Sequence, residues 1–461
     1  MKTNSKYIFF ISLVSAMGGL LFGYDWVVIG GAKPFYEQFF GLTNTPVLQG
    51  WAMSCALIGC LFGAVLSGFL SDKYGRKYLL LGSAALFFLT SLGTGFAKTF
   101  TFFVFARMSG GIAIGLASNL SPMYIAEVSP ANARGKYVSL NQLTIVIGIL
   151  AAQFMNWIIA DRVPLGATGS EILQSWNGQV GWRWMFWASA VPAGLFFLFM
   201  WLVPESPRWL ARKRENHSKA RAILARIGGE EYANAEIAEI ETTLTDPPRK
   251  IDFKALLHPG MRRIMTIGIL IAVFQQWCGI NVIFNYAQEV FAAAGYGVSD
   301  TLFNIVITGS VNLIFTFIGM FTVDRLGRKA LMLTGAGGLA GIYAVMGGLY
   351  FFHFKGLPLL ILVVGAIACY SMSLAPVTWV ILSEIFPNRV RGVAMSVATI
   401  ALWAACFILT YTFPILNVTL NASGTFWLYG LICVMGFWYI MKKLPETKGR
   451  SLEQIEHEFT R

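Results

Sequence analysis

The chain has 461 residues, of which 56% are hydrophobic and only 13% are charged. This share of charge, about half of what soluble proteins carry, excludes a soluble protein of this length, and the apolar content excludes an intrinsically disordered chain. The 35 Lys and Arg residues exceed the 23 Asp and Glu residues. In a membrane protein such an excess indicates the positive-inside bias and not a nucleic-acid partner.

Twelve apolar runs are long enough to cross a bilayer as helices, since a span needs about 20 mostly apolar residues. Six lie on each side of a polar central segment, so the sequence predicts an all-α membrane protein. The first run is interpreted as a retained span and not as a cleaved signal peptide. The runs begin near Ile8, Leu48, Leu79, Phe100, Val138, Trp182, Met265, Leu302, Leu331, Leu357, Val393 and Thr425.

The positive charges predict the orientation of these spans. Of the 35 basic residues, 29 fall in the termini and loops of one side, and Arg107 lies inside a span. By the positive-inside rule both termini are cytoplasmic, in a multi-pass protein of the cell membrane, or of the inner membrane if the source is bacterial. The five basic residues assigned to the opposite side are Lys33, Lys98, Arg162, Arg183 and Lys355.

Three loop motifs of the first half recur in the second half, which indicates an internal duplication. An Asp-x-x-Gly-Arg-Lys loop begins at Asp72 and again 252 residues later. A Glu and an Arg seven residues apart follow the fourth and the tenth runs, and a Pro-Glu-Ser/Thr motif follows the sixth and the twelfth. Repeated halves are typical of transporters that rock around a central site.

Charges in these loops predict ion pairs that hold the two halves together on the cytoplasmic face and break when that face opens. The residues assigned to this gate are Asp72, Arg76, Glu127, Arg134, Glu205, Arg328, Glu384, Arg391 and Glu446.

These motifs, with Gln275-Gln276-x-x-Gly-Ile-Asn281, make the chain similar to the sugar porters of the major facilitator superfamily over essentially its whole length. Within the family it most resembles the bacterial xylose–proton symporters, chiefly in the run from Gly115 to Glu127. The resemblance implies two six-helix bundles, residues 1–204 and 261–444. A cytoplasmic helical segment at 205–260 joins them, and a cytoplasmic tail follows at 445–461. It also implies a monomer without cofactors.

Two charges lie alone within spans and predict a buried acid–base pair. Asp25 belongs to the first span and Arg107 to the fourth. Charged groups inside a membrane are costly and usually functional. Protonation of Asp25 would weaken its pairing with Arg107 and free the first span to move, which makes the pair a candidate proton switch. The family resemblance implies the same, since its proton-coupled members carry an acid here.

Amide side chains inside spans are candidates for binding a sugar, because amides donate and accept hydrogen bonds as sugar hydroxyls do. Gln275 and Asn281 are six positions apart, and a break in the helix at Gly279 would help them converge. Pro376 predicts a kink before Trp379. By resemblance, the sugar-contacting residues are Gln142, Gln275, Gln276, Asn281, Asn312 and Trp379, with Phe22 and Trp403 as cavity aromatics.

The rim of the expected site differs from that of the proton-coupled xylose carriers. The substituted positions are Ile149, Ser189, Asn285, Ala375 and Leu402. A monosaccharide, either a pentose such as xylose or a hexose such as glucose, therefore stays the expected substrate without a choice between them.

Three other functions are alternatives to a symporter. No nucleotide-binding loop, catalytic triad or His/Cys metal set is present in the sequence, which argues against an enzyme or a primary pump. A membrane sugar sensor would need a signalling extension, and the chain stops 16 residues after Pro445. A passive uniporter is the main alternative, and Asp25 argues against it.

Overall fold

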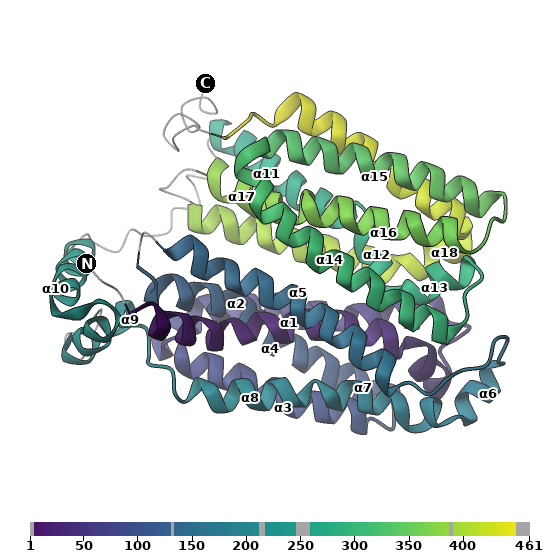
Figure 1. Cartoon of the computed structure of the whole chain (residues 1–461), viewed down its shortest axis with the longest axis horizontal. Coiled ribbons are helices and arrows are strands. Elements are labelled where there is room, and N and C mark those ends of the chain that lie inside the picture. The colour runs from purple at the N-terminus through teal and green to yellow at the C-terminus, as the bar shows by residue number, and fades with distance from the viewer. Residues whose placement is uncertain (1–3, 131–132, 212–216, 246–258, 387–390, 449–461) are drawn as a thin grey trace. The chain divides into compact units, whose positions relative to one another are not determined.

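The computed structural model describes residues 4–130, 133–211, 217–245, 259–386 and 391–448, and every regular element within these ranges is a helix (Figure 1). The predicted cytoplasmic tail at 445–461 therefore lies mostly outside the described residues. The elements of the first half are α1 (Ser5–Phe40), α2 (Pro46–Tyr74), α3 (Lys77–Phe96), α4 (Phe100–Val128), α5 (Arg134–Ile159), α6 (Gly169–Gln174), the π-helix η1 (Asn177–Gly181), α7 (Trp182–Ala188), α8 (Ala190–Met200), α9 (Pro207–Ala211) and α10 (His217–Thr245). Those of the second half are α11 (Pro259–Trp277), α12 (Ile280–Asn285), α13 (Ala287–Ala293), α14 (Val298–Leu326), α15 (Arg328–Phe351), α16 (Leu357–Met372), α17 (Leu374–Ile385) and α18 (Arg391–Lys443).

The number of spans agrees with the prediction. Within the described residues, 11 helical segments are long and apolar enough to cross a membrane. The last of them covers 50 residues and contains two helices that meet at Asn421, where φ is 57°. Twelve spans result, and the predicted class of all-α membrane protein is confirmed.

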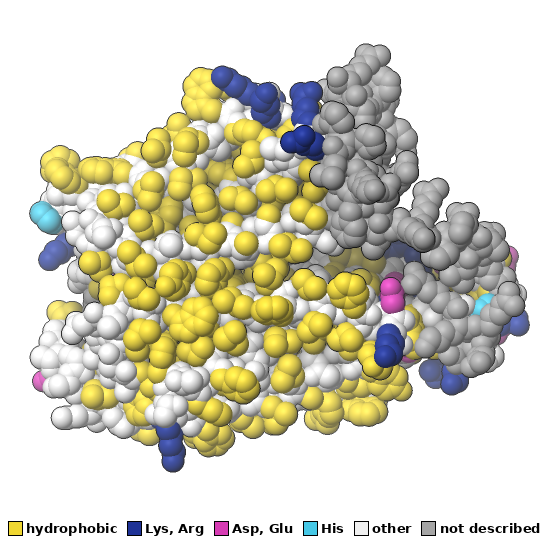
Figure 2. Space-filling view, turned by 180° about the vertical axis from the view of Figure 1, so that it is seen from behind, with side chains coloured by type: hydrophobic (Ala, Val, Ile, Leu, Met, Phe, Trp, Pro, Cys, Tyr) yellow, Lys and Arg dark blue, Asp and Glu magenta, His cyan; other side chains and the backbone are white. Residues whose placement is uncertain are grey.

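Large apolar side chains point outward along the helices. Phe69 and Phe321, in α2 and α14, expose 77% and 74% of their surface. Figure 2 shows hydrophobic side chains covering the length of the helices on one face, with Lys, Arg, Asp and Glu near the helix ends. In water such a surface would drive aggregation, whereas lipid tails solvate it.

Contacts between Cα atoms divide the chain into two compact units. The first unit contains residues 1–28, 55–155 and 183–250, and the second contains 29–54, 156–182 and 251–461. Helices α1, α2 and α5 thus contribute residues to both units. This division differs from the two bundles that the family resemblance implies, and the bundle boundaries at 204 and 261 stay a prediction.

Glycines bring helices of the first unit into backbone contact. A Cβ atom at Gly111 of α4 would lie 2.0 Å from the carbonyl oxygen of Ala56 in α2, and one at Gly115 would lie 2.2 Å from that of Cys60. Close approach through small residues is how membrane helices gain packing energy, since lipid offers no hydrophobic driving force between them.

The described part of the central polar segment is helical, as the family resemblance implies. In the described part, α9 is followed by α10, which breaks at Gly229 (φ 86°, ψ 174°). Leu210, Ala211, Ala220 and Ile240 form a small apolar core between these helices. The described part of this segment therefore folds as a helical unit with a core of its own.

Candidate functional site

Asp25 and Arg107 form the buried ion pair that the sequence predicts, and both belong to the first unit. Nη1 of Arg107 donates a hydrogen bond to Oδ1 of Asp25. The two residues expose only 7% and 4% of their surface, and the guanidinium carbon lies 5.6 Å from the centre of the Phe186 ring. The pairing is confirmed, whereas its action as a proton switch stays a prediction.

The backbone of α1 is held tightly beside this pair. A Cβ atom at Gly23 would lie 1.9 Å from the carbonyl oxygen of Ile145 in α5, and one at Gly148 would lie 2.1 Å from that of Leu20. The charges therefore sit on a rigid frame in which neither can reach water easily. Leaving one of them without its partner costs about 3–5 kcal/mol in such a site.

Three amide side chains meet in the second unit where the seventh span is broken. Helix α11 ends at Trp277, Gly279 adopts a left-handed conformation (φ 85°), and α12 begins at the next residue. Nδ2 of Asn281 donates to Oε1 of Gln276, and Nε2 of Gln276 donates to Oε1 of Gln275 at 2.5 Å. The predicted break at Gly279 is confirmed, and it makes this chain of amides possible.

The amide chain continues to a tyrosine that the sequence did not single out. Nε2 of Gln275 donates to the hydroxyl of Tyr370 on α16 at 2.8 Å. The next residue, Ser371, donates to Oδ1 of Asn312 on α14 at 2.6 Å. A tyrosine in an apolar run gives little signal, but its place shortly before Ser373 and Pro376 could have pointed to a broken span.

The tenth span breaks at Ser373 and not at the proline itself. Its backbone (φ −121°, ψ −84°) separates α16 from α17. The ring of Pro376 clashes with a helical carbonyl four residues earlier, at Met372, which explains the position. Trp379 is 38% exposed and Trp403 is 8% exposed.

The remaining predicted sugar-contacting residues belong to the first unit. Gln142 on α5 is half-buried. The ring of Phe22 packs edge-on against Trp26 with 5.9 Å between centroids. Their place relative to the amides of the second unit stays a prediction.

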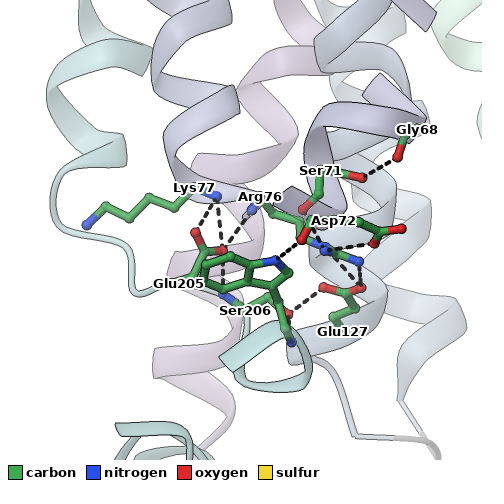
Figure 3. A network of polar contacts seen from close by, with 9 residues as sticks. Gly68, Ser71, Asp72, Arg76, Lys77, Glu127, Glu205 and Ser206 are labelled. Atoms are coloured by element: carbon green, nitrogen blue, oxygen red, sulfur yellow. Dashed lines mark hydrogen bonds and ion pairs between the residues drawn. The ribbon is translucent and has the colours of Figure 1, made fainter. Parts of the chain in front are cut away.

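The repeated loop charges build a compact network in the first unit (Figure 3). Arg76 donates to Oε1 of Glu127 through Nη2 at 2.9 Å and Nε at 3.2 Å, and to the carbonyl of Ser71 at 2.9 Å. Glu205 accepts from the backbone nitrogens of Arg76 and Lys77 at 2.9 and 3.1 Å. Asp72 lies 3.7 Å from Arg76, and Ser206 donates to Glu127.

The second unit repeats the main contacts of this network. Nη2 of Arg328 donates to Oε1 of Glu384 at 3.0 Å, and Thr447 donates to the other oxygen of Glu384 at 2.5 Å. Glu446 accepts from the backbone nitrogens of Arg328 and Lys329 at 2.9 and 3.0 Å. The glycine that precedes each arginine has nearly the same φ, 89° at Gly75 and 90° at Gly327.

These contacts join helices and loops within each unit. The predicted pairing of one half with the other half is not among them and stays a prediction. Arg134 donates through Nε to the carbonyl of Ala126 at 3.1 Å. The side chain of Arg391 lies outside the part of the chain that the structure describes.

The two equivalent glutamates differ in their acidity. Burial raises the pKa of Glu205, although the backbone nitrogens of Ser206, Lys77 and Arg76 donate to it. Burial also acts to raise the pKa of Glu446, but the backbone nitrogens of Lys448, Arg328, Lys329 and Thr447 outweigh it and lower the pKa. This difference agrees with the deeper burial of the side chains in the first network.

One group of charges contradicts the sequence-based reading. Lys33 was assigned to an outer loop, and only Asp25 and Arg107 were expected deep in spans. Helix α1 instead continues through Pro34 to Phe40, and it buries both Lys33 and Glu37, at 3% and 7% exposure. Nζ of Lys33 pairs with Glu37 at 3.1 Å and with Glu289 of α13.

Twelve spans, a duplicated framework, a buried acid–base pair and amides gathered at a broken helix define a secondary membrane transporter. Residues 11–459 match the family described as "Sugar (and other) transporter". The chain belongs to this sugar porter family, whose characterised members are transporters and not enzymes.

The relatives are similar along nearly their whole length. The D-xylose-proton symporter of Escherichia coli is 38% identical, with 98% of this chain and 96% of the relative covered. The arabinose-proton symporter of Bacillus subtilis is 36% identical over 98% and 94%. The glucose transport protein of Synechocystis is 38% identical over 98% and 97%. The xylose transporter of Escherichia coli in an inward-open conformation matches with a TM-score of 0.85 and 36% identity, covering 98% of this chain and all of that one.

Proposed function

We propose that this chain carries a monosaccharide into the cell together with a proton, by alternating access. The observation that carries the proposal is the buried pair of Asp25 and Arg107. An ionised pair is neutral overall, and protonation of Asp25 would leave an unpaired positive charge in a dry site. Protonation would therefore change the energy of the surrounding helices by several kcal/mol.

The substrate class follows from the polar groups of the second unit. Gln275, Gln276 and Asn281 supply amide donors and acceptors without net charge, which suits the hydroxyls of a neutral sugar. Relatives that carry xylose, arabinose or glucose support the same class. A pentose or hexose is therefore proposed as the substrate, carried by a single copy of the chain.

The orientation follows from the distribution of basic residues. Both termini and the repeated loop motifs are proposed to lie in the cytoplasm, because the loops on that side hold most of the Lys and Arg. Protons and sugar would then enter from the face to which α1 and α13 direct Lys33 and Glu289.

Uptake into vesicles with an imposed proton gradient tests the proposal. A potential of about 100 mV is worth about 2.3 kcal/mol for one proton, enough for roughly 50-fold accumulation of a neutral sugar. Radiolabelled D-xylose, L-arabinose and D-glucose would be compared with and without a protonophore. We expect one of them to accumulate only when the gradient is present.

The Asp25→Asn variant separates coupling from binding. It should lose accumulation but still exchange internal for external sugar, because the amide cluster is unchanged. Glu231→Gln, on the exposed surface of α10, is the matched control and should accumulate normally. Gradient-driven accumulation by Asp25→Asn would contradict the role of Asp25 in coupling. Wild-type uptake that only equilibrates the sugar would contradict symport and favour a uniporter.

A further inference from the structure

A second set of buried charges lies apart from Asp25 and Arg107 and consists of Lys33, Glu37 and Glu289. All three belong to the second unit. Nζ of Lys33 lies 3.1 Å from Glu37, one helical turn further along α1, and it donates to Oε1 of Glu289 on α13. The side chains of Lys33, Glu37 and Glu289 expose 4%, 9% and 23% of their surface.

The surrounding packing fixes these side chains in place. A Cβ atom at Gly30 would lie 3.0 Å from the carbonyl oxygen of Asn285, so α1 touches the backbone at the end of α12. Nζ of Lys33 lies 5.3 Å from the centre of the Tyr286 ring, a cation–π distance. The hydroxyl of Tyr286 is itself held by a 2.6 Å hydrogen bond to the carbonyl of Thr410. The packing of α1 and the hydrogen bond of Tyr286 thus both hold the cluster in position.

The cluster contains more acidic than basic groups. Two carboxylates share one ammonium group, and among the described residues the only other titratable group facing them is Tyr286, whose hydroxyl is already a donor elsewhere. When all three are ionised, the cluster carries a net charge of −1 where little water can reach. Two carboxylates that share a confined site do not both ionise readily.

One oxygen of the cluster is placed to receive a proton. Oε2 of Glu289 is buried and has no hydrogen-bond donor among the residues that the structure describes. Oε1 of the same residue accepts from Lys33. Because Glu289 is also the most exposed of the three side chains, it offers the route by which a proton from bulk water can enter.

We propose that Lys33, Glu37 and Glu289 form a second proton-binding site, separate from Asp25, in which the two carboxylates hold one proton between them. The proton comes from water and is carried as an O–H group on a carboxyl, which makes the cluster neutral. The use of the site in transport rests on the proposed function, because the cluster would then sense the pH on the side from which sugar enters. Proton binding itself does not depend on that function.

Difference titration of purified full-length protein in detergent tests the site without any sugar. The Asp25→Asn variant serves as the reference, so that Asp25 contributes nothing. Proton uptake is followed with a pH indicator, and protonated carboxyl groups are followed by their infrared C=O band. We expect the reference protein to take up about one proton per chain more near neutral pH than variants that lack one of the two carboxylates, in addition to the uptake by the four His residues that all of them share.

Three further substitutions in this background identify the site. Glu37→Gln and Glu289→Gln should each abolish the neutral-range step and its infrared band, because one carboxylate then pairs with Lys33. Lys33→Met should move the step to higher pH, because the two carboxylates lose their counter-charge. Glu231→Gln, at an exposed position, should change the titration only in the acidic range.

The outcomes separate this proposal from the proposed function. If the reference protein and its Glu37→Gln and Glu289→Gln derivatives titrate identically near neutral pH, the second site does not exist, even if wild-type vesicles show symport. If the step is present but uptake is uncoupled from protons, the site stands and symport fails. If one of the two glutamine variants does not fold, the other variant still tests whether the titration step is lost. The shift of the step to higher pH in Lys33→Met tests the site independently.

Discussion

Arg76 and Arg328 occupy equivalent places in the two repeated networks, yet we expect their loss to have unequal effects. Replacing either with Met keeps the apolar stem and removes the charge. The side chains of Arg76 and Glu127 expose 5% and 14%, whereas those of Arg328 and Glu384 expose 14% and 22%. After the arginine is replaced, water can therefore solvate the unpaired Glu384 of the second unit better than the unpaired Glu127 of the first.

The size of the difference follows from this burial. Breaking a well-buried pair costs about 3–5 kcal/mol, so Arg76→Met should destabilise the protein by that amount. A hydrogen bond to a charged group nearer water is worth about 1.5–3 kcal/mol, which is the cost expected for Arg328→Met. The gap between them corresponds to roughly tenfold in the unfolding equilibrium.

Unfolding of the purified variants in detergent by a chaotrope, followed by tryptophan fluorescence, would measure both costs. Lys73→Met, at an exposed position in the last turn of α2, three residues before Arg76, should change stability by less than about 0.5 kcal/mol. Combining Arg76→Met with Glu127→Gln should cost less than the sum of the single changes, since the second change removes the abandoned charge. Equal costs for the two arginines, or a larger cost for Arg328, would refute the reasoning from burial.

Two other predictions concern packing and sugar binding. Gly111→Val should lower the yield of monodisperse protein and its melting temperature, because its Cβ atom would lie 2.0 Å from a backbone oxygen; Gly82→Ala, with nothing within 4 Å, is the control. Gln276→Leu should weaken sugar binding by roughly 10- to 100-fold, measured as competition in exchange assays, because it breaks the amide chain between Asn281 and Gln275. Unchanged melting in the first case, or unchanged affinity in the second, would contradict these contacts.

Much of the architecture could be predicted because membranes restrict what a sequence can do. Helix length, apolar runs and repeated loop motifs determined the twelve spans and the duplication. The pairing of Asp25 with Arg107 was predictable because a lone acid and a lone base in apolar spans have few other partners. The break at Gly279 was predictable because Gln275 and Asn281 are six positions apart, a spacing that does not place them on one face of a regular helix.

The failures have equally physical causes. Lys33 and Glu37 were missed because charges near the end of an apolar run look like loop residues, and Pro34 strengthened that impression. Helix α1 continues for 36 residues because partners on α13 compensate those charges, and a partner 256 positions away in sequence leaves no local signal. Likewise, the loop motifs identified the members of each network but not which arginine meets which glutamate.

The duplication also explains how a proton and a sugar could be handled by different groups on one framework. Gly23-Tyr24-Asp25 recurs as Gly279-Ile280-Asn281, 256 residues later, close to the 252-residue offset of the loop motifs. At the same offset from Arg107 stands Val363, which is fully buried. The first half therefore has an acid, Asp25, paired with a base, Arg107. The equivalent positions of the second half have an amide, Asn281, and an apolar residue, Val363.

This asymmetry bears directly on the expected behaviour of Asp25→Asn. An amide donates and accepts hydrogen bonds at any pH, so recognition of a neutral sugar by Gln276 and Asn281 needs no titrating group. Only the acid of the first half changes charge within this repeated pair of positions. Removing that charge should thus abolish sugar accumulation driven by the proton gradient while the amides continue to bind sugar, which is why exchange without accumulation is the expected result.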